Sequence, residues 1–266
     1  MSRPDIFYQP LEGETSGLPH DPFKSFAIPR PIGWISTTSQ SGQDNLAPFS
    51  QFQNVSFDPP TVLFIGHQDL YKKRSRDTVM NCIETNEFVW NMATYAIGTR
   101  RLGLGPLLTD VCRHKLREAV NNTGKETWDD EFQEFGIEKA PSRLVRPPRV
   151  KDSPVSFECR VHSIVRVAND FHGKKAAGPH MVGNSDIVIG RVLGIHIKGD
   201  YITGDGLFDV LKAAPIARLG YRQYTYIDNI FEMTIPSMPD EGNAASVLSG
   251  NLPYRDLKEE EADKTA

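Results

Sequence analysis

The sequence predicts a mainly β barrel that carries α-helices in its connections, and two observations support this prediction. Short runs rich in β-branched and aromatic residues recur along the chain, as from Ile32 to Thr38 and from Phe88 to Met92. Clusters of turn-forming residues bound these runs, such as the stretch SQSGQDN at 39–45. Many short strands with few helices are typical of a β barrel with helical insertions.

The first half of the chain contains a strand and a helix in close succession. A strand is expected from Thr61 to Ile65, preceded by two prolines that cannot donate hydrogen bonds to a sheet. A helix is expected over residues 75–86, where Ser75 or Asp77 can cap the first turn. Its apolar residues Val79, Cys82 and Ile83 have helical spacing.

The remaining elements follow from the same signals. We expect helices from Lys115 to Val120 and from Asp129 to Phe135, with Gly136 ending the second helix. Long strands are expected from Val155 to Val167 and from Ile187 to Ile197. A short strand from Tyr201 to Thr203 and a short helix from Ala213 to Leu219 are expected after them. Residues 1–24 are interpreted as an N-terminal arm, 25–230 as the barrel domain with an α-rich insertion at 97–147, and 231–266 as a C-terminal tail.

Composition excludes several classes of protein. The formal charge of −4 argues against an electrostatic nucleic-acid binder. No apolar stretch is long enough to span a membrane, and the first residues do not form a signal peptide. Cys82, Cys112 and Cys159 have no CxxC spacing, so the sequence predicts no metal site and no disulfide framework. Reduced thiols in a cytoplasmic protein are the simplest interpretation.

Three neighbouring segments carry residues suited to binding a flat, phosphorylated ligand. The run from Trp34 to Thr38 places three hydroxyl side chains at a strand end, a pattern that is also common at solvent-facing strand ends. The segment from Asn45 to Phe52 contains an internal proline, so we expect irregular backbone with free N–H and C=O groups. Cations from Lys72 to Arg76 precede the helix expected at 75–86, where a phosphate is favoured, although such a charge run is often only a solvated surface.

These segments together resemble a known family. IPRPIGWIST, DNLAPFSQFQNVSFDPPTVLF and RDTVMNCIETNEFVWN are similar to blocks of the flavin reductase-like, FMN-binding split-barrel proteins. The resemblance continues in SRLVRPPRVKDSPVSFEC, GNSDIVIGRVLGIHI and ARLGYRQY and covers roughly residues 23 to 226. It implies a Greek-key-like split β-barrel that forms a homodimer and binds FMN near the subunit interface.

The resemblance also implies which residues bind the cofactor. The phosphate is expected at the strand-end hydroxyls and the helix start, and the isoalloxazine edge at the segment beginning with Asn45. The expected cofactor-binding residues are Trp34, Ser36, Thr37, Asn45, Leu46, Ala47, Ser50, Gln51, Asn54, Lys73, Arg74, Ser75, Arg76 and Thr78. Backbone amides around Ala47 are the candidates for stabilising negative charge on the reduced flavin. The expected electron donor is NADH or NADPH, and a separate monooxygenase is an expected partner.

The sequence departs from the family at three points. Many reductases of this family carry Asp-His where this chain has Ser185-Asp186, which makes a pyridine-nucleotide role less secure than flavin binding. His180, in the preceding loop, is a candidate substitute, although a lone loop histidine is more often a bystander. The usual Gly-Gly is here Gly220-Tyr221, and residues 98–114 are an additional stretch that could form a lid or plain surface.

Three functions remain open at this point. The first is an NAD(P)H-dependent flavin reductase, in which hydride transfer needs no obligatory catalytic side chain. The second is an oxidoreductase or electron carrier that holds FMN permanently and acts on its own substrate. The third is a split-barrel binding protein without catalytic activity.

Overall fold

The structure, a computed structural model, describes residues 4–10, 14–68, 74–95, 119–124, 130–168 and 184–231. Residues 1–228 form one compact unit, and residues 229–266 form a second, of which the described part ends at residue 231. The expected domain limits at 25 and 230 stay a prediction.

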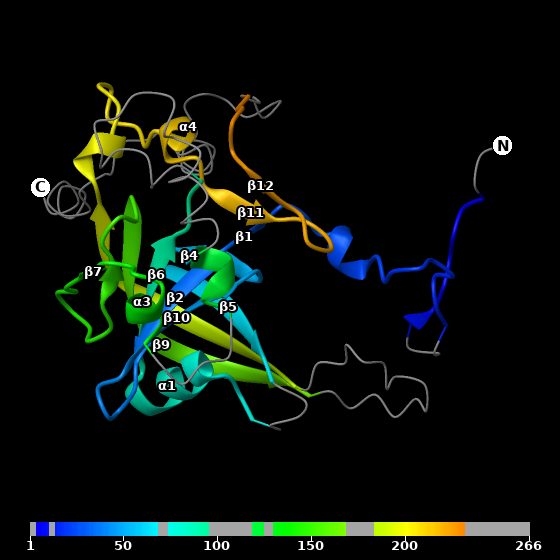
Figure 1. Cartoon of the computed structure of the whole chain (residues 1–266), viewed down its shortest axis with the longest axis horizontal. Coiled ribbons are helices and arrows are strands. Elements are labelled where there is room, and N and C mark those ends of the chain that lie inside the picture. The colour runs from blue at the N-terminus through cyan, green and yellow to red at the C-terminus, as the bar shows by residue number, and fades with distance from the viewer. Residues whose placement is uncertain are drawn as a thin grey trace, which may run out of the picture. The chain divides into compact units, whose positions relative to one another are not determined.

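A seven-stranded antiparallel sheet is the framework of the molecule (Figure 1). Its strand order is β3-β2-β6-β9-β10-β5-β4. The strands are β2 (Gly33–Thr38), β3 (Asp44–Phe49), β4 (Phe52–Phe57), β5 (Pro60–His67), β6 (Glu87–Met92), β9 (Val155–Val167) and β10 (Ser185–Ile197). The sheet curls so that β3 and β5, which are far apart in this order, contact each other. This curled sheet confirms the predicted mainly β, split-barrel architecture.

Smaller elements surround this sheet. β1 (Arg30–Pro31), β11 (Ile216–Arg218) and β12 (Tyr224–Tyr226) form a three-stranded sheet, and β7 (Lys139–Ala140) pairs with β8 (Arg149–Val150). The described helices include α1 (Asp77–Thr85), α3 (Glu131–Glu134) and α4 (Val210–Ala213), with the 3-10 turns η2 (Phe23–Ser25) and η5 (Gly199–Tyr201).

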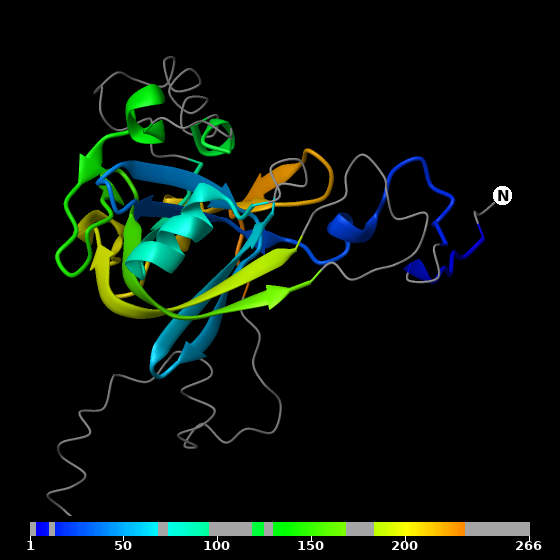
Figure 2. The same ribbon diagram turned by 90° about the horizontal axis from the view of Figure 1, so that it is seen from below.

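Helix α1 packs across the curled sheet, against β2, β3, β6 and β10 (Figure 2). Its buried Val79 lies directly over Gly66 in β5: a Cβ atom at Gly66 would come within 2.4 Å of the Val79 Cγ2 atom. Glycine is therefore required for α1 to approach β5 this closely. This contact brings the beginning of α1 beside the end of β5.

Aromatic and aliphatic side chains fill the barrel. Phe52 and Trp90 stack with their ring centroids 5.1 Å apart and nearly parallel, and Phe64 lies edge-on to Phe88. A second cluster, around Trp34 and including Leu46 and Phe132, joins β2 and β3 to α3. The thiols of Cys82 and Cys159 are free and buried in the first cluster, where burial raises the pKa of both groups.

Several expected elements are confirmed, and three are wrong. Seven elements lie within a few residues of their expected positions: the strands β2, β5, β6, β9 and β10 and the helices α1 and α3. As expected, Gly136 follows α3, with a φ of 63°. Of the helix expected from Lys115 to Val120, residues 119–120 lie in a helical stretch that runs to 122, and residues 115–118 lie outside the described residues.

Two of the wrong expectations lie near the end of the domain. The predicted strand from Tyr201 to Thr203 is instead the turn η5 followed by an isolated bridge at Ile202. The predicted helix from Ala213 to Leu219 is instead the end of α4 followed by β11. Ala214 ends α4 in the left-handed conformation, with a φ of 46°, and β11 then pairs with both β1 and β12.

The third wrong expectation concerns the segment from Asn45 to Phe52. Most of it is the regular strand β3, which pairs along its length with β2, and only residues 50–51 lie outside the strands. Pro48 is tolerated because β3 is an edge strand, where a missing N–H group interrupts no second ladder.

Candidate functional site

A cleft of about 220 Å³ lies between the beginning of α1, the edge strand β3 and the end of β5. Thr123, Gly124 and Glu131 supply a further wall. The lining residues are Asn45, Ala47, Pro48, Phe49, Ser50, Gln51, Ile65, His67, Arg74, Ser75, Arg76, Asp77, Thr78, Thr123, Gly124 and Glu131.

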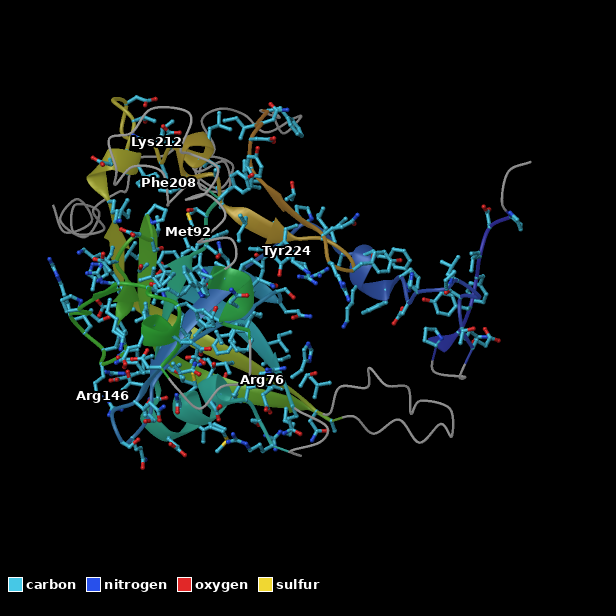
Figure 3. All side chains as sticks on the ribbon, in the orientation of Figure 1. Arg76, Met92, Arg146, Phe208, Lys212 and Tyr224 are labelled. Atoms are coloured by element: carbon cyan, nitrogen blue, oxygen red, sulfur yellow. The ribbon has the colours of Figure 1, made fainter. Side chains whose placement is uncertain are left out.

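The beginning of α1 forms the basic end of the cleft. Arg76 occupies the N-cap position, and a guanidinium group has no acceptor with which to cap the first N–H groups of the helix. Those groups and the positive end of the helix dipole therefore face the cleft without a side-chain cap. Arg76 is exposed there (Figure 3), and Arg74 forms a 2.9 Å ion pair with Asp77 in the first turn. This end of the cleft is suited to an anion.

Ser75 has a structural partner below the cleft. Its side chain is buried, and its hydroxyl group donates a 2.6 Å hydrogen bond to the Oδ2 atom of Asp186, at the beginning of β10. Arg166 of β9 holds the other oxygen of Asp186 at 2.7 Å. This chain of contacts fixes the beginning of α1 to two neighbouring strands.

Polar side chains connect β3 to α1 along the floor of the cleft. Asn45 donates a 2.9 Å hydrogen bond from Nδ2 to the Oγ1 atom of Thr78. Thr37, on β2, is fully buried and accepts a 3.0 Å hydrogen bond from the Nδ2 atom of Asn81. Thr37 thus supports the residues that line the cleft, rather than lining it itself.

The outer edge of β3 is partly occupied by the beginning of α3. The Leu46 N–H group donates a 3.0 Å hydrogen bond to the Oε2 atom of Glu131, whose side chain is buried at the beginning of α3. Because N–H groups along an antiparallel strand alternate in direction, the amide of Ala47 points the opposite way, toward its partner Ile35 in β2. The Ala47 amide is therefore directed into the sheet, and the role expected for the backbone amides around Ala47 stays a prediction.

His67 lies at the end of β5, opposite Ser185 in the register between β5 and β10. Its Nδ1 atom is 2.8 Å from the Ser185 Oγ atom. Burial lowers the pKa of His67, and the nearby cations Lys24 and Arg76 lower it further. The ring is therefore neutral at pH 7 and half-buried in the wall of the cleft.

The structure brings together eight of the fourteen expected cofactor-binding residues: Asn45, Ala47, Ser50, Gln51, Arg74, Ser75, Arg76 and Thr78 line the cleft. Four others lie beneath or behind it, since Trp34, Ser36, Thr37 and Leu46 are fully buried. Asn54 is exposed on the other edge strand, β4. Lys73 and His180, together with residues 98–114, lie outside the described residues.

The positions of Ser36 and Trp34 have a simple cause. Successive side chains in a strand point to opposite faces, so only alternate residues of β2 can face α1. Ser36 points away from α1 and donates a 2.5 Å hydrogen bond to the Pro148 carbonyl group, and Trp34 donates from Nε1 to the Oγ1 atom of Thr123 at 3.1 Å. These two side chains hold Thr123 and Pro148 against β2.

Three lining residues that sequence reasoning did not assign to the site carry ionisable groups: His67, Asp77 and Glu131. His67 ends the apolar run TVLFIG, and its position at a strand end was an available signal. No local signal in the sequence identifies Glu131, because nothing near it in the sequence shows that α3 packs against β3. Among the described residues, no group of three or more His, Cys, Asp or Glu side chains could hold a metal ion, and no helix is long and apolar enough to cross a membrane.

Comparisons with known proteins agree with this architecture. Residues 25–211 match the family model described as flavin reductase like domain. An uncharacterized protein of Aquifex aeolicus is 32% identical over 197 residues, which cover 74% of this chain and 84% of that protein. Among solved structures, nitrilotriacetate monooxygenase component B from Bacillus cereus has a TM-score of 0.63 at 22% identity, over 79% of this chain and 91% of that one. The 2-nitrobenzoate 2-nitroreductase NbaA of Pseudomonas fluorescens has a TM-score of 0.60 at 22% identity, over 83% of this chain and 92% of that one. The chain belongs to the flavin reductase-like family.

Proposed function

We propose that the cleft binds FMN, with the phosphate at the beginning of α1 and the isoalloxazine ring along β3 toward Ser50 and Gln51. The observation that carries this proposal is the uncapped start of α1 beside Arg74 and Arg76, at one end of a cleft with mixed polar and apolar walls. A phosphate there would gain charge-assisted hydrogen bonds from the arginines and backbone N–H groups. Asp77 faces the same end, and its ion pair with Arg74 limits the repulsion of an anion.

The proposed activity is NAD(P)H-dependent reduction of this flavin. Bound FMN would supply the hydride-accepting chemistry, and the role of the chain is to hold and orient both molecules. Ser50 and Gln51 leave the regular strands at the middle of the cleft, where their backbone groups can pair with the ring edge. The Leu46 amide and the Ala47 amide are directed elsewhere, as described above.

We further propose a homodimer. One chain offers about 220 Å³, less than the roughly 300–1,000 Å³ typical of ligand pockets, so FMN would extend beyond the cleft of a single chain. Leu193, Ile195 and Ile197 alternate along the outer half of β10 and are 40%, 53% and 52% exposed. Alternate residues share one face of a strand, so these three form an apolar stripe suited to a second copy.

The likeness to a monooxygenase component supports a partner oxygenase that receives reduced flavin. The likeness to a nitroreductase supports the second candidate, an oxidoreductase that keeps its FMN and reduces its own substrate. A single experiment separates the two. Purified protein is loaded with FMN, dialysed, and assayed for oxidation of NADH and NADPH with and without added FMN. A reductase loses its FMN on dialysis and oxidises the nicotinamide only when FMN is added, whereas the alternative stays yellow and shows no such dependence.

The binding site itself is tested with Arg76→Ala. Loss of one charge-assisted contact to the phosphate should cost roughly 1.5–3 kcal/mol of FMN binding energy. Arg160→Ala is the matched control, because Arg160 is also exposed but lies on β9 outside the cleft. An FMN dissociation constant that is the same for Arg76→Ala, Arg160→Ala and the wild type would move the phosphate away from α1. If the wild type shows no flavin binding by fluorescence titration, the proposed function itself is wrong.

A further inference from the structure

His67 is placed so that one ring nitrogen is anchored and the other can meet a ligand. Its Nδ1 atom pairs with the Ser185 hydroxyl group at 2.8 Å, and the ring makes no other hydrogen bond with the described residues. The side chain lines the cleft together with Arg76. The anchored Nδ1 atom fixes the plane of the ring, which leaves the Nε2 atom as the group available to the contents of the cleft.

The charges around His67 make its protonation depend on what the cleft holds. Lys24 and Arg76 are close enough to lower the pKa of His67, and burial acts in the same direction. An anion placed beside Arg76 would offset this repulsion and would favour the protonated ring. The other charged groups on the packed elements are Arg74, Asp77, Arg166, Asp186 and Glu131.

These groups are largely compensated within the protein. Arg74 pairs with Asp77, and Arg166 pairs with Asp186, whose side chain is wholly buried. Glu131 accepts the Leu46 amide at the far wall of the cleft, on β3. Among the described residues, Lys24 and Arg76 are therefore the charges that act on His67, and both make the local field more positive.

We propose that His67 is a ligand of the FMN phosphate and takes up a proton from solvent when that dianion binds. This inference rests on the proposed FMN site. In the complex, the protonated ring would donate from Nδ1 to the Ser185 hydroxyl group and from Nε2 to a phosphate oxygen. The site would thereby distinguish FMN from riboflavin, which has the same ring system but no phosphate.

The sign of the pH dependence follows from this proton uptake. His67 has a lowered pKa in the free protein and a higher one in the complex, so binding takes up protons at pH values between the two. FMN affinity should therefore rise as the pH falls through the bound-state pKa. The second pKa of a phosphate monoester is about 6, and its protonation opposes this trend in every variant. The contribution of His67 is therefore the difference between the pH dependence of FMN affinity in the wild type and that in a His67 variant.

The test is isothermal titration of FMN and riboflavin into three proteins: wild type, His67→Gln and the control His162→Gln. His162 is an exposed histidine of β9 that does not line the cleft. Titrations at pH 6.5 in buffers of different ionisation enthalpy give the number of protons taken up. We expect His67→Gln to weaken FMN binding about tenfold, to reduce proton uptake and to change riboflavin binding less than about twofold. His162→Gln should match the wild type.

A second measurement needs no substitution at His67. The pKa of His67 in the wild type is measured by NMR from its ring protons, with and without saturating inorganic phosphate, and should rise when phosphate is present. Equal proton uptake in wild type and His67→Gln, an equal loss of riboflavin and FMN affinity, or an unchanged pKa would each overturn the proposal. FMN binding without proton uptake would leave the FMN site intact and remove only His67 from it. No FMN binding by the wild type would instead contradict the proposed function.

Discussion

The hydroxyl group of Ser75 donates a 2.6 Å hydrogen bond to the wholly buried carboxylate of Asp186, and this contact fixes the beginning of α1 to the beginning of β10. Asp186→Asn removes the charge that Arg166 compensates. We expect a loss of roughly 1–3 kcal/mol in the free energy of unfolding, measured by urea denaturation, together with weaker FMN binding. Asp228→Asn, at an exposed aspartate, is the control. Equal stability of both variants and the wild type would show that the contact contributes little.

Gly66→Ala tests the close packing of α1 on β5. The new methyl group would lie 2.4 Å from the Val79 Cγ2 atom, so α1 or β5 must shift. Overpacking of this kind costs about 1–3 kcal/mol. Gly199→Ala provides the comparison, because a Cβ atom there meets nothing within 4 Å. We expect thermal unfolding to occur at a lower temperature for Gly66→Ala alone, and the opposite order would mean that the contact is relaxed in solution.

Tyr221 adopts a φ of 51°, in the left-handed region that side chains disfavour. Its ring is half-exposed and contacts His20 edge-on, with the centroids 5.8 Å apart, so it points to the N-terminal arm. At positions with ordinary backbone angles, a protein variant with glycine is less stable than one with alanine. At position 221 the order should reverse, because glycine adopts a positive φ without strain. We expect Tyr221→Gly to be more stable than Tyr221→Ala by about 1 kcal/mol in chemical denaturation. An alanine variant that equals or exceeds the glycine variant would contradict the strained conformation.

The ionisation of Glu158 makes the free energy of unfolding depend on pH. Burial acts to raise the pKa of Glu158, but hydrogen bonds from His196, Arg143 N–H and Leu144 N–H outweigh it, so the pKa is lowered. A lowered folded-state pKa stabilises the protein above the unfolded value of about 4.3, and this stabilisation is lost as the pH falls through the folded value.

Glu158→Gln should therefore be less stable than the wild type at pH 7, by about 2 kcal/mol, and the difference should shrink in acid. Urea denaturation from pH 7 to pH 3 measures both quantities. Glu84→Gln, at an exposed position of α1, controls for the loss of one charge. A constant difference between wild type and Glu158→Gln across this range would place the acid dependence elsewhere.

Ile195→Lys tests the proposed homodimer. A lysine in the middle of the apolar stripe would place a charge in the interface, so analytical ultracentrifugation should show a dimer for the wild type and a monomer for the variant. Ile83→Lys is matched to it, because Ile83 is 50% exposed on α1 and lies outside the stripe. A monomeric wild type would refute the homodimer, and a dimeric Ile195→Lys protein would move the interface away from β10.

Elements dictated by local pattern could be predicted from the sequence. The thirteen-residue strand β9 was expected with its observed bounds, because its β-branched residues and the prolines that precede it are local signals. β11 could not be found this way, since its strand conformation depends on pairing with β1, which lies far away in the sequence. The same distinction applies to the site: Arg74, Arg76 and Asn45 belong to compact motifs, whereas the face of β2 that Ser36 occupies depends on how the sheet curls.

The hydrogen bond between Leu46 and Glu131 has a consequence beyond the cleft. An edge strand normally offers its outward N–H groups to any extended chain, which is a route to aggregation. Glu131 occupies one of these groups on β3, and α3 packs beside the same strand. Helix α3 thus shields the sheet against unwanted strand addition, while its residue Glu131 also lines the cleft. A chain from which α3 is removed would be expected to self-associate through β3 even where its barrel still folds.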